Sequence, residues 1–185
     1  MGWRGGARAG SRLPRRHVIL VGLPGSGKTT VGRLAAAALG APFVDLDEVI
    51  AQCAGKSVAR IFAEDGEPAF RALEAAAGRE ALEGPAAVLA PGAGFFAQPV
   101  TRALAGGSGL VVYLQTEPGE AAARLGGAAG RPLLEGGATV ERIAALLDVR
   151  EASYAAAERT VPTGGRSPAE VAGDVVSLAR ALAGW

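Results

Sequence analysis

The sequence of 185 residues is poor in cysteine, histidine and aromatic side chains. It contains one Cys, one His, two Trp, two Tyr and five Phe. The single cysteine, Cys53, excludes a disulfide within the chain and a cysteine-based zinc site, which is typical of a reducing compartment. We therefore expect a cytoplasmic protein. Because the only histidine is His17, we expect Cys53 to be a small buried hydrophobic residue rather than a nucleophile.

Long hydrophobic runs and a strong net charge are also missing. No uncharged stretch reaches the roughly 20 apolar residues of a membrane span without a Gly or Pro. The formal net charge is +1, but residues 1–16 carry five Arg and no acidic residue, whereas the remainder has a net charge of −4. An acidic body argues against nucleic acid as a partner. We expect residues 1–16 to be a solvated tail, with an Arg-rich targeting peptide as the alternative, before a single, monomeric domain over residues 17–185.

Apolar runs of strand length alternate with segments of helical periodicity, which is typical of an α/β fold with a parallel sheet. The continuous apolar run at 18–21 predicts a strand that is covered on both faces. The predicted strands are residues 18–21, 43–44, 86–90 and 110–114. The predicted helices run from the glycine loop to Gly40 and over about 48–54, 57–65, 67–83 and 139–158, and a last one starts at Ser167-Pro168.

Residues 22–29 read GLPGSGKT, which matches the phosphate-binding pattern G-x-x-x-x-G-K-[ST] between a buried strand and a helix. The glycines let backbone N–H groups converge on a phosphate at the positive end of the helix. Lys28 supplies a cation for the β- and γ-phosphates, and the Thr29 hydroxyl can bind Mg²⁺. The sequence therefore predicts ATP binding by Gly25, Ser26, Gly27, Lys28, Thr29 and Thr30.

Two aspartates, Asp45 and Asp47, follow the second predicted strand. Residues two apart on a strand share a face, so both carboxylates are expected at the carboxyl edge of the sheet, where ligands of open α/β sheets bind. We assign Asp45 to the Mg²⁺ shell and Asp47 to an acceptor hydroxyl, as an orienting group and possible base. A turn or a helix cap is the plainer interpretation of such a pair.

Three arginines are further candidates. Arg71 either pairs with Glu67 or Glu74 on a solvated helix face or presents a planar fork to a carboxylate, and the spacing does not decide between these. Arg150 lies on the apolar stripe of the predicted helix 139–158, where a buried guanidinium needs an anion. Arg131 lies in a Gly-rich segment, which suggests a lid that closes over phosphate or an ordinary surface loop.

Together these motifs resemble the shikimate kinase family, within the P-loop group that is similar to nucleoside monophosphate kinases. The resemblance rests on the phosphate loop, the Asp45-x-Asp47 pair, the G-E-x-x-F-R-x-x-E block at 66–74, a glycine cluster at 92–94, the RPLL at 131–134, and Arg150 with a tyrosine four residues on. It implies a three-layer fold in which helices flank a five-stranded parallel sheet. It also implies substrate-binding helices at about 46–83 and a flexible lid at about 125–138.

The resemblance further implies transfer of the ATP γ-phosphate to the 3-hydroxyl of shikimate, in aromatic amino-acid biosynthesis. It implies catalytic roles for Lys28, Asp47 and Arg131, nucleotide contacts by Arg124, Arg131 and Arg166, and Mg²⁺ binding by Thr29 and, through water, Asp45. Shikimate would be bound by Asp47, Arg71, Gly92, Ala93, Gly94 and Arg150.

Position 93 departs from the family pattern of three consecutive glycines. An alanine there would be strained if the backbone is left-handed, and its methyl group could crowd the acceptor. The following Phe95-Phe96 pair is expected in the core. Two alternatives stay open for the function: a related kinase with a gluconate-like acceptor, and a nucleotide-binding relative that has lost catalysis.

Overall fold

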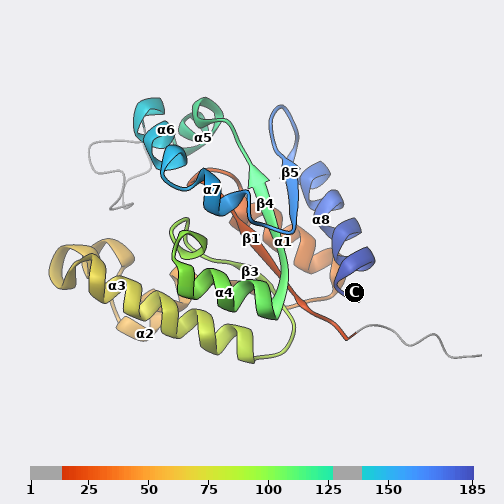
Figure 1. Cartoon of the computed structure of the whole chain (residues 1–185), viewed down its shortest axis with the longest axis horizontal. Coiled ribbons are helices and arrows are strands. Elements are labelled where there is room, and N and C mark those ends of the chain that lie inside the picture. Colours follow the sequence, from red (N-terminus) through yellow and green to blue (C-terminus); the bar gives the residue numbers. More distant parts are fainter. Residues whose placement is uncertain (1–13, 127–138) are drawn as a thin grey trace, which may run out of the picture.

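The molecule is built on a five-stranded parallel sheet. The computed structural model describes residues 14–126 and 139–185. The strand order is β2-β3-β1-β4-β5, and all neighbouring strands are parallel. The strands are β1 (His17–Val21), β2 (Phe43–Asp45), β3 (Val88–Ala90), β4 (Gly109–Gln115) and β5 (Arg159–Pro162). The arrangement in Figure 1 confirms the predicted α/β fold and five-stranded sheet.

Helices cover both faces of the sheet because its central strand is apolar on both sides. In β1, Val18 and Leu20 pack into the core cluster that includes residues of α1 and α8, whereas Ile19 and Val21 pack into the cluster on the opposite face. Figure 1 shows α1 and α8 together on one side, and α3 and α4 on the other. The bounds are α1 (Lys28–Leu39), α2 (Leu46–Ala54), α3 (Val58–Glu83), α4 (Pro99–Ser108) and α8 (Pro168–Leu182).

The parallel strands all end at one edge of the sheet, and this edge gathers the candidate residues. β1 leads into the phosphate loop, β2 ends at Asp45, and β3 leads into the segment 91–94. Loops at this edge are the usual ligand-binding loops of open parallel sheets. Segments that are distant in the sequence therefore meet there.

One predicted helix is wrong in its continuity. Residues 139–158 form α6 (Val140–Asp148) and α7 (Glu151–Tyr154), with Arg150 as the N-cap of α7 at φ −122° and ψ −13°. The break leaves Val149 76 % exposed and Arg150 buried. The apolar stripe was thus identified correctly, but a turn rather than continuous helical periodicity buries the arginine.

Other boundaries differ less. The helices predicted at 57–65 and 67–83 are the two arms of α3, which is interrupted at Gly66 by a left-handed backbone (φ 82°). The sequence pattern missed α4, β5, a 3₁₀ turn η1 (Phe95–Ala97) and α5 (Pro118–Leu125). These elements are short, and β5 is an edge strand in which only Val161 is buried, so it lacks the alternating pattern of a half-buried strand. The predicted start of α8 is confirmed by a capping box between Ser167 and Glu170.

The chain termini correct the expectation of a wholly solvated tail. Residues 1–13 lie outside the described residues, but Arg16 donates to the Gly109 carbonyl at 2.7 Å. The Arg15 guanidinium lies 4.8 Å from the centre of the Trp185 ring, and the Trp185 indole N–H donates to the Arg16 carbonyl at 2.9 Å. Of the predicted lid, residues 127–138, which include Arg131, also lie outside the described residues.

Two single-residue expectations had opposite outcomes. Cys53 is exposed on α2, so the prediction of a buried cysteine is wrong. It lies one residue before the end of a short helix that buries only Leu46 and Ile50. Phe95 and Phe96 are 1 % and 3 % exposed and belong to the core, as predicted.

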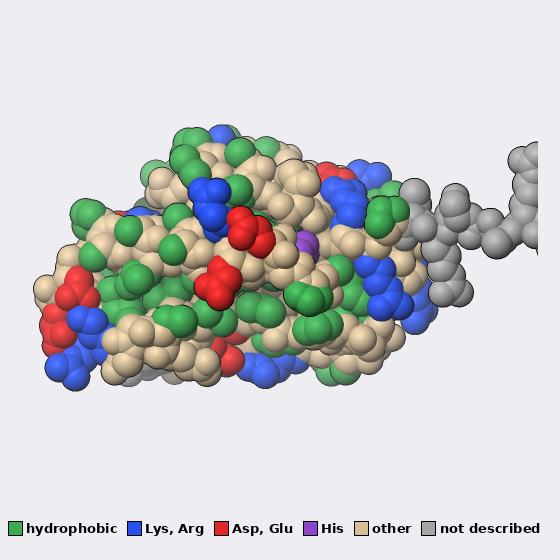
Figure 2. Space-filling model, turned by 90° about the horizontal axis from the view of Figure 1, so that it is seen from below, with side chains coloured by type: hydrophobic (Ala, Val, Ile, Leu, Met, Phe, Trp, Pro, Cys, Tyr) green, Lys and Arg blue, Asp and Glu red, His purple; other side chains and the backbone are tan. Residues whose placement is uncertain are grey.

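In the view of Figure 2, the described surface has no continuous basic face. None of the described helices is long and apolar enough to cross a membrane. On the face in Figure 2, Lys and Arg side chains occur in separate groups, several of them beside acidic side chains.

Candidate active site

The phosphate loop has the backbone shape that its glycines predict. Gly25 and Gly27 have left-handed backbones (φ 80° and 92°), which side-chain-bearing residues rarely adopt. A Cβ on Gly25 would lie 2.5 Å from the carbonyl oxygen of Ala121, so α5 packs directly against the loop. Gly27 caps α1, whose N-terminus therefore opens at the loop. This is a ready site for an anion.

Lys28 lies over the same loop. Its Nζ donates to the carbonyl oxygens of Gly22 and Leu23, at 2.9 Å each. The buried Ser26 hydroxyl oxygen, at the turn of the loop, has no hydrogen-bond partner among the described residues. The loop thus holds a cation and a buried polar atom beside a helix N-terminus.

Thr29, in the first turn of α1, and Asp45, at the end of β2, form a polar pair. The Thr29 hydroxyl donates to Asp45 Oδ2 at 2.8 Å, and Asp45 Oδ1 accepts from the backbone N–H of Asp47 at 3.1 Å. Asp45 is both the last residue of β2 and the N-cap of α2, so Asp47 lies in the first helical turn. The strand-face argument for the two aspartates is therefore wrong, although both line the same cleft.

That cleft, of about 380 Å³, runs from the phosphate loop in two directions. One end reaches Asp47, Gly92 and Ala93. The other end is lined by Arg124, Thr163, Arg166, Pro168 and Val171. The six residues of the phosphate loop and helix start that were expected to bind the nucleotide, Gly25 to Thr30, all line this cleft between the two ends.

The two arginines at the far end are held by the chain itself. Arg124 donates to the hydroxyl and the carbonyl oxygens of Thr163, at 3.1 and 3.0 Å. Arg166 pairs with Asp174 at 2.8 Å and donates to the Pro162 carbonyl at 3.1 Å. Arg124 is thus fixed by Thr163, the residue after β5, and Arg166 by bonds to β5 and α8.

The glycines after β3 pack tightly against charged side chains. A Cβ on Gly92 would lie 2.8 Å from Glu74 Oε1 and 3.0 Å from Asp47 Oδ1. A Cβ on Gly94 would lie 2.5 Å from Arg71 Nη1. We define the acceptor loop as residues 92–94. Because two of its residues lack side chains, charged side chains of α2 and α3 pack directly against its backbone at the end of the cleft.

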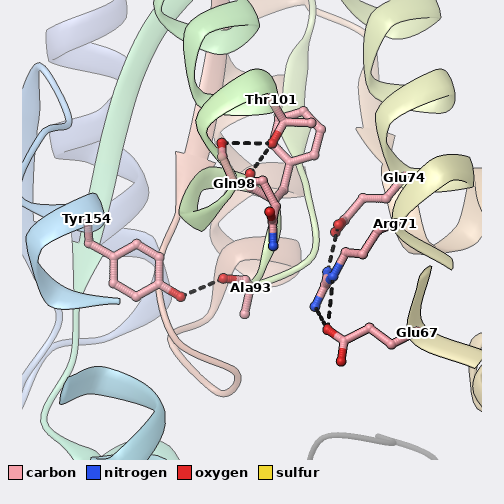
Figure 3. Close-up of polar contacts among 8 residues, drawn as sticks. Glu67, Arg71, Glu74, Ala93, Gln98, Thr101 and Tyr154 are labelled. Atoms are coloured by element: carbon pink, nitrogen blue, oxygen red, sulfur yellow. Dashed lines mark hydrogen bonds and ion pairs between the residues drawn. The ribbon is translucent and has the colours of Figure 1, made fainter. Parts of the chain in front are cut away.

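Arg71 pairs with both glutamates on its own helix, as one of the two interpretations held. It lies 2.9 Å from Glu67 and 2.7 Å from Glu74 (Figure 3). The face is only partly solvated, because Glu67 is 54 % exposed whereas the side chains of Arg71 and Glu74 are only 17 % and 1 % exposed. Arg71 does not line the cleft itself and lies behind Gly94.

Glu74 is a site residue that the sequence reasoning passed over. Burial raises the pKa of Glu74, the Arg71 guanidinium opposes that rise, and the Asp47 carboxylate adds to it. Its Oε1 atom is buried without a hydrogen-bond partner among the described residues. The signal was available, because Glu74 lies four residues after Phe70 and four before Gly78, on the buried stripe of α3.

Arg150 is buried, as predicted, with 7 % of its surface exposed. Its Nη1 atom has no hydrogen-bond partner among the described residues. Its charge acts against the rise in the pKa of Glu74, so the guanidinium lies within electrostatic range of that carboxyl, although it does not line the cleft. The site thus contains two buried, incompletely bonded side chains of opposite sign, Arg150 and Glu74, of which Glu74 lies near Asp47.

Ala93 fits its position without backbone strain. No described residue other than glycine has a positive φ, so the left-handed conformation that would disfavour alanine does not occur here. The Ala93 carbonyl accepts a hydrogen bond from the Tyr154 hydroxyl at 2.6 Å (Figure 3). Ala93 lines the cleft, so its methyl group adds bulk next to the acceptor end.

Comparisons with known proteins agree on one family. A family model described as shikimate kinase matches residues 24–180. The chain is 45 % identical over 161 residues to a shikimate kinase of Mycobacterium avium, which covers 86 % of this chain and 90 % of the relative. It is 41 % identical over 160 residues to one of Geobacter metallireducens, covering 86 % of this chain and 89 % of the relative.

Solved structures show the same fold. A shikimate kinase from Acinetobacter baumannii in complex with shikimate superposes with a TM-score of 0.87 at 33 % identity, covering 90 % of this chain and 94 % of the other. A gluconokinase from Sinorhizobium meliloti superposes with a TM-score of 0.63 at 18 % identity, covering 91 % and 94 %. The second likeness is one of fold alone.

Proposed function

Because this chain belongs to the shikimate kinase family, we propose that its cleft transfers the γ-phosphate of ATP to the 3-hydroxyl of shikimate, with the residue roles given below. The chain is an ATP-dependent kinase whose acceptor is an alcohol. The observation that carries the roles is that the cleft beginning at the phosphate loop reaches Asp47 and the acceptor loop, with Glu74 and Arg71 packed directly against the glycines of that loop.

The nucleotide half is assigned to ATP from its local geometry. Backbone N–H groups of residues 25–30 and the N-terminus of α1 would hold the β- and γ-phosphates. Lys28 exchanges its two carbonyl partners for phosphate oxygens. Arg124 and Arg166, which line the far end of the cleft, would flank the base. Arg131, outside the described residues, is proposed to contact the phosphates from the lid.

Mg²⁺ fits the Thr29–Asp45 pair. The described residues contain no group of three or more His, Cys, Asp or Glu side chains that could cage a metal. A single hydroxyl–carboxylate pair beside a phosphate site suits Mg²⁺, which keeps several waters and binds substrate phosphate. When bound, the ion would neutralise charge on the phosphates. Thr29 would be its ligand and Asp45 would hold its water.

The acceptor half is assigned to shikimate. The guanidinium groups of Arg71 and Arg150 would receive its carboxylate, which also gives Arg150 Nη1 the partner it lacks. Asp47 would orient the 3-hydroxyl and accept its proton as the new O–P bond forms and the bond to the bridging oxygen of ADP breaks. Gly92, Ala93 and Gly94 would line the ring. Catalysis then rests on positioning and charge neutralisation.

The test compares two polyol acids. We expect ADP release with shikimate to exceed that with gluconate by at least about 100-fold in kcat/KM, since the site fixes a rigid ring rather than an open chain. Replacing Arg150 with Ala should raise KM for shikimate by about 100-fold and KM for ATP by less than about 2-fold. Equal rates with both acids, or equal changes in both KM values, would contradict these assignments.

We also propose a monomer that acts in the cytoplasm on small molecules in aromatic amino-acid biosynthesis. The scarcity of cysteine supports the location. Sedimentation at micromolar concentration should give a mass close to 18.5 kDa. A mass of twice that value would contradict the monomer.

A further inference from the structure

Tyr154 is a buried polar residue that the proposed reaction does not use. It lies at the end of α7 with none of its surface exposed. Its ring stacks on that of Tyr113, with centroids 5.1 Å apart. Its hydroxyl donates to the Ala93 carbonyl at 2.6 Å, in the middle of the acceptor loop (Figure 3). Burial explains the ring, but an apolar side chain would fill the same space.

The side chains of the acceptor loop form no hydrogen bonds that could hold it in place, because its residues are Gly, Ala and Gly. Two of its three residues are glycines, which restrict backbone conformation least. Its two ends are tied to the following turn, because the N–H of Phe95 donates to the Gly92 carbonyl at 3.0 Å and the N–H of Ala97 donates to the Gly94 carbonyl at 3.1 Å. The Thr101 hydroxyl in turn donates to the Phe95 carbonyl (Figure 3). The Tyr154 bond fixes the middle of the loop.

Tyr154 is also one helical turn from Arg150. The backbone N–H of Tyr154 donates to the Arg150 carbonyl at 2.9 Å, so the two residues belong to one rigid turn. The same turn is tied to α4, because Arg102 donates to the Ser153 hydroxyl at 2.9 Å. Burial raises the pKa of Tyr154 to about 12, and the neighbouring Arg150 guanidinium acts against that rise. The phenol therefore stays protonated and able to donate throughout the working range.

We propose that Tyr154 is a positioning residue that sets the acceptor loop at a fixed distance from Arg150, so that the loop and the guanidinium receive shikimate together. Its hydroxyl joins the peptide of Ala93 to the turn that carries Arg150. The inference rests on the acceptor site proposed above. It requires no contact between Tyr154 and the substrate.

The test is Tyr154→Phe, which keeps the stacked ring and removes the hydroxyl. We expect KM for shikimate to rise about 10-fold, the equivalent of one neutral hydrogen bond, with kcat changed less than about 3-fold and KM for ATP unchanged. The matched control is Tyr113→Phe, whose hydroxyl makes no hydrogen bond within the described part of the chain. That variant should leave both KM values unchanged.

A second measurement does not require Tyr154→Phe to fold. The chain has two tyrosines, so Tyr113→Phe grown with 3-fluorotyrosine carries a single fluorine label, at Tyr154. Its ¹⁹F resonance should shift on saturation with shikimate and stay in place with ADP alone. A ¹⁹F resonance whose chemical shift does not change on addition of shikimate would overturn the proposal.

The kinetic outcomes separate this inference from the proposed function. A lower Tm for Tyr154→Phe with unchanged KM values, or an equal rise in both, would reduce Tyr154 to a packing residue. If Arg150→Ala leaves KM for shikimate unchanged, the acceptor site itself is wrong. If Arg150→Ala raises it and Tyr154→Phe does not, only the positioning role fails.

Discussion

The two halves of the cleft are built in opposite ways. The phosphate half, by which we mean the part of the cleft around the phosphate loop, comes from one continuous segment, residues 22–30. Its shape depends on the backbone conformation at Gly25 and Gly27. The acceptor half comes from four separate segments, α2, α3, the acceptor loop and the turn before α7. Its shape depends on side chains that hold one another, such as Arg71 between Glu67 and Glu74.

This difference follows from the ligands. A phosphate group is small, highly charged and common to many substrates, so backbone N–H groups and a helix N-terminus suffice. A polyol acid has hydroxyls and a carboxylate on different sides, which only side chains from several directions can meet. Mutations in the acceptor half should therefore change acceptor kinetics while leaving nucleotide binding intact.

The largest effect is expected for Asp47→Ala, at the border between the halves. Removal of the group that orients the hydroxyl and accepts its proton should lower kcat by about 1,000-fold or more. The affinity for ATP, measured by calorimetry, should change little because the phosphate half is intact. The control is Glu48→Ala, the next residue in α2, which forms an exposed ion pair with Arg33. Near-normal turnover of Asp47→Ala would assign it the wrong role.

A steric change should have an intermediate effect. In Gly94→Ala the new methyl group meets the Arg71 guanidinium at 2.5 Å, so Arg71 must move. We expect KM for shikimate to rise about 30-fold, part of the cost of displacing a charge-paired arginine. Gly119→Ala is the control, because a Cβ added there would have no neighbour within 4 Å among residues 14–126 and 139–185, apart from its own turn of helix. If both variants behave alike, the close packing of the acceptor loop has no functional consequence.

The smallest effect concerns stability and its pH dependence. Burial raises the pKa of Glu74 above 4.5, so the folded protein binds a proton more tightly than the unfolded chain. The wild type should therefore lose stability as pH rises from 4.5 through the raised value, and Glu74→Gln should not.

The measurement is Tm for both proteins between pH 4 and 7.5. The Tm of Glu74→Gln minus that of the wild type should increase with pH by about 2 °C or more, which corresponds to a fraction of a kcal/mol for this chain length. Glu67→Gln, which replaces the 54 % exposed partner of Arg71, is the control and should show a smaller trend. A difference that falls with pH would contradict the sign of the shift.

Much of the fold was predictable from periodicity. The buried run of β1, the phosphate loop and the capped start of α8 are local patterns, and each was located to within a residue or two. β5 was missed because it is a four-residue edge strand in which only Val161 is buried, so it has no apolar run and no alternation to detect. Cys53 was misplaced because the pattern does not say how deeply a short helix is buried.

By itself, the sequence determined the phosphate half and the family, because a phosphate loop is a local property: neighbouring residues and their allowed backbone angles define it. Only the tertiary structure decided that Glu74 and Asp47 meet at Gly92, that Ala93 is unstrained, and that Tyr154 reaches the acceptor loop across 61 positions of sequence. The physical reason is that burial and convergence depend on how the parallel strands bring distant loops to one edge of the sheet.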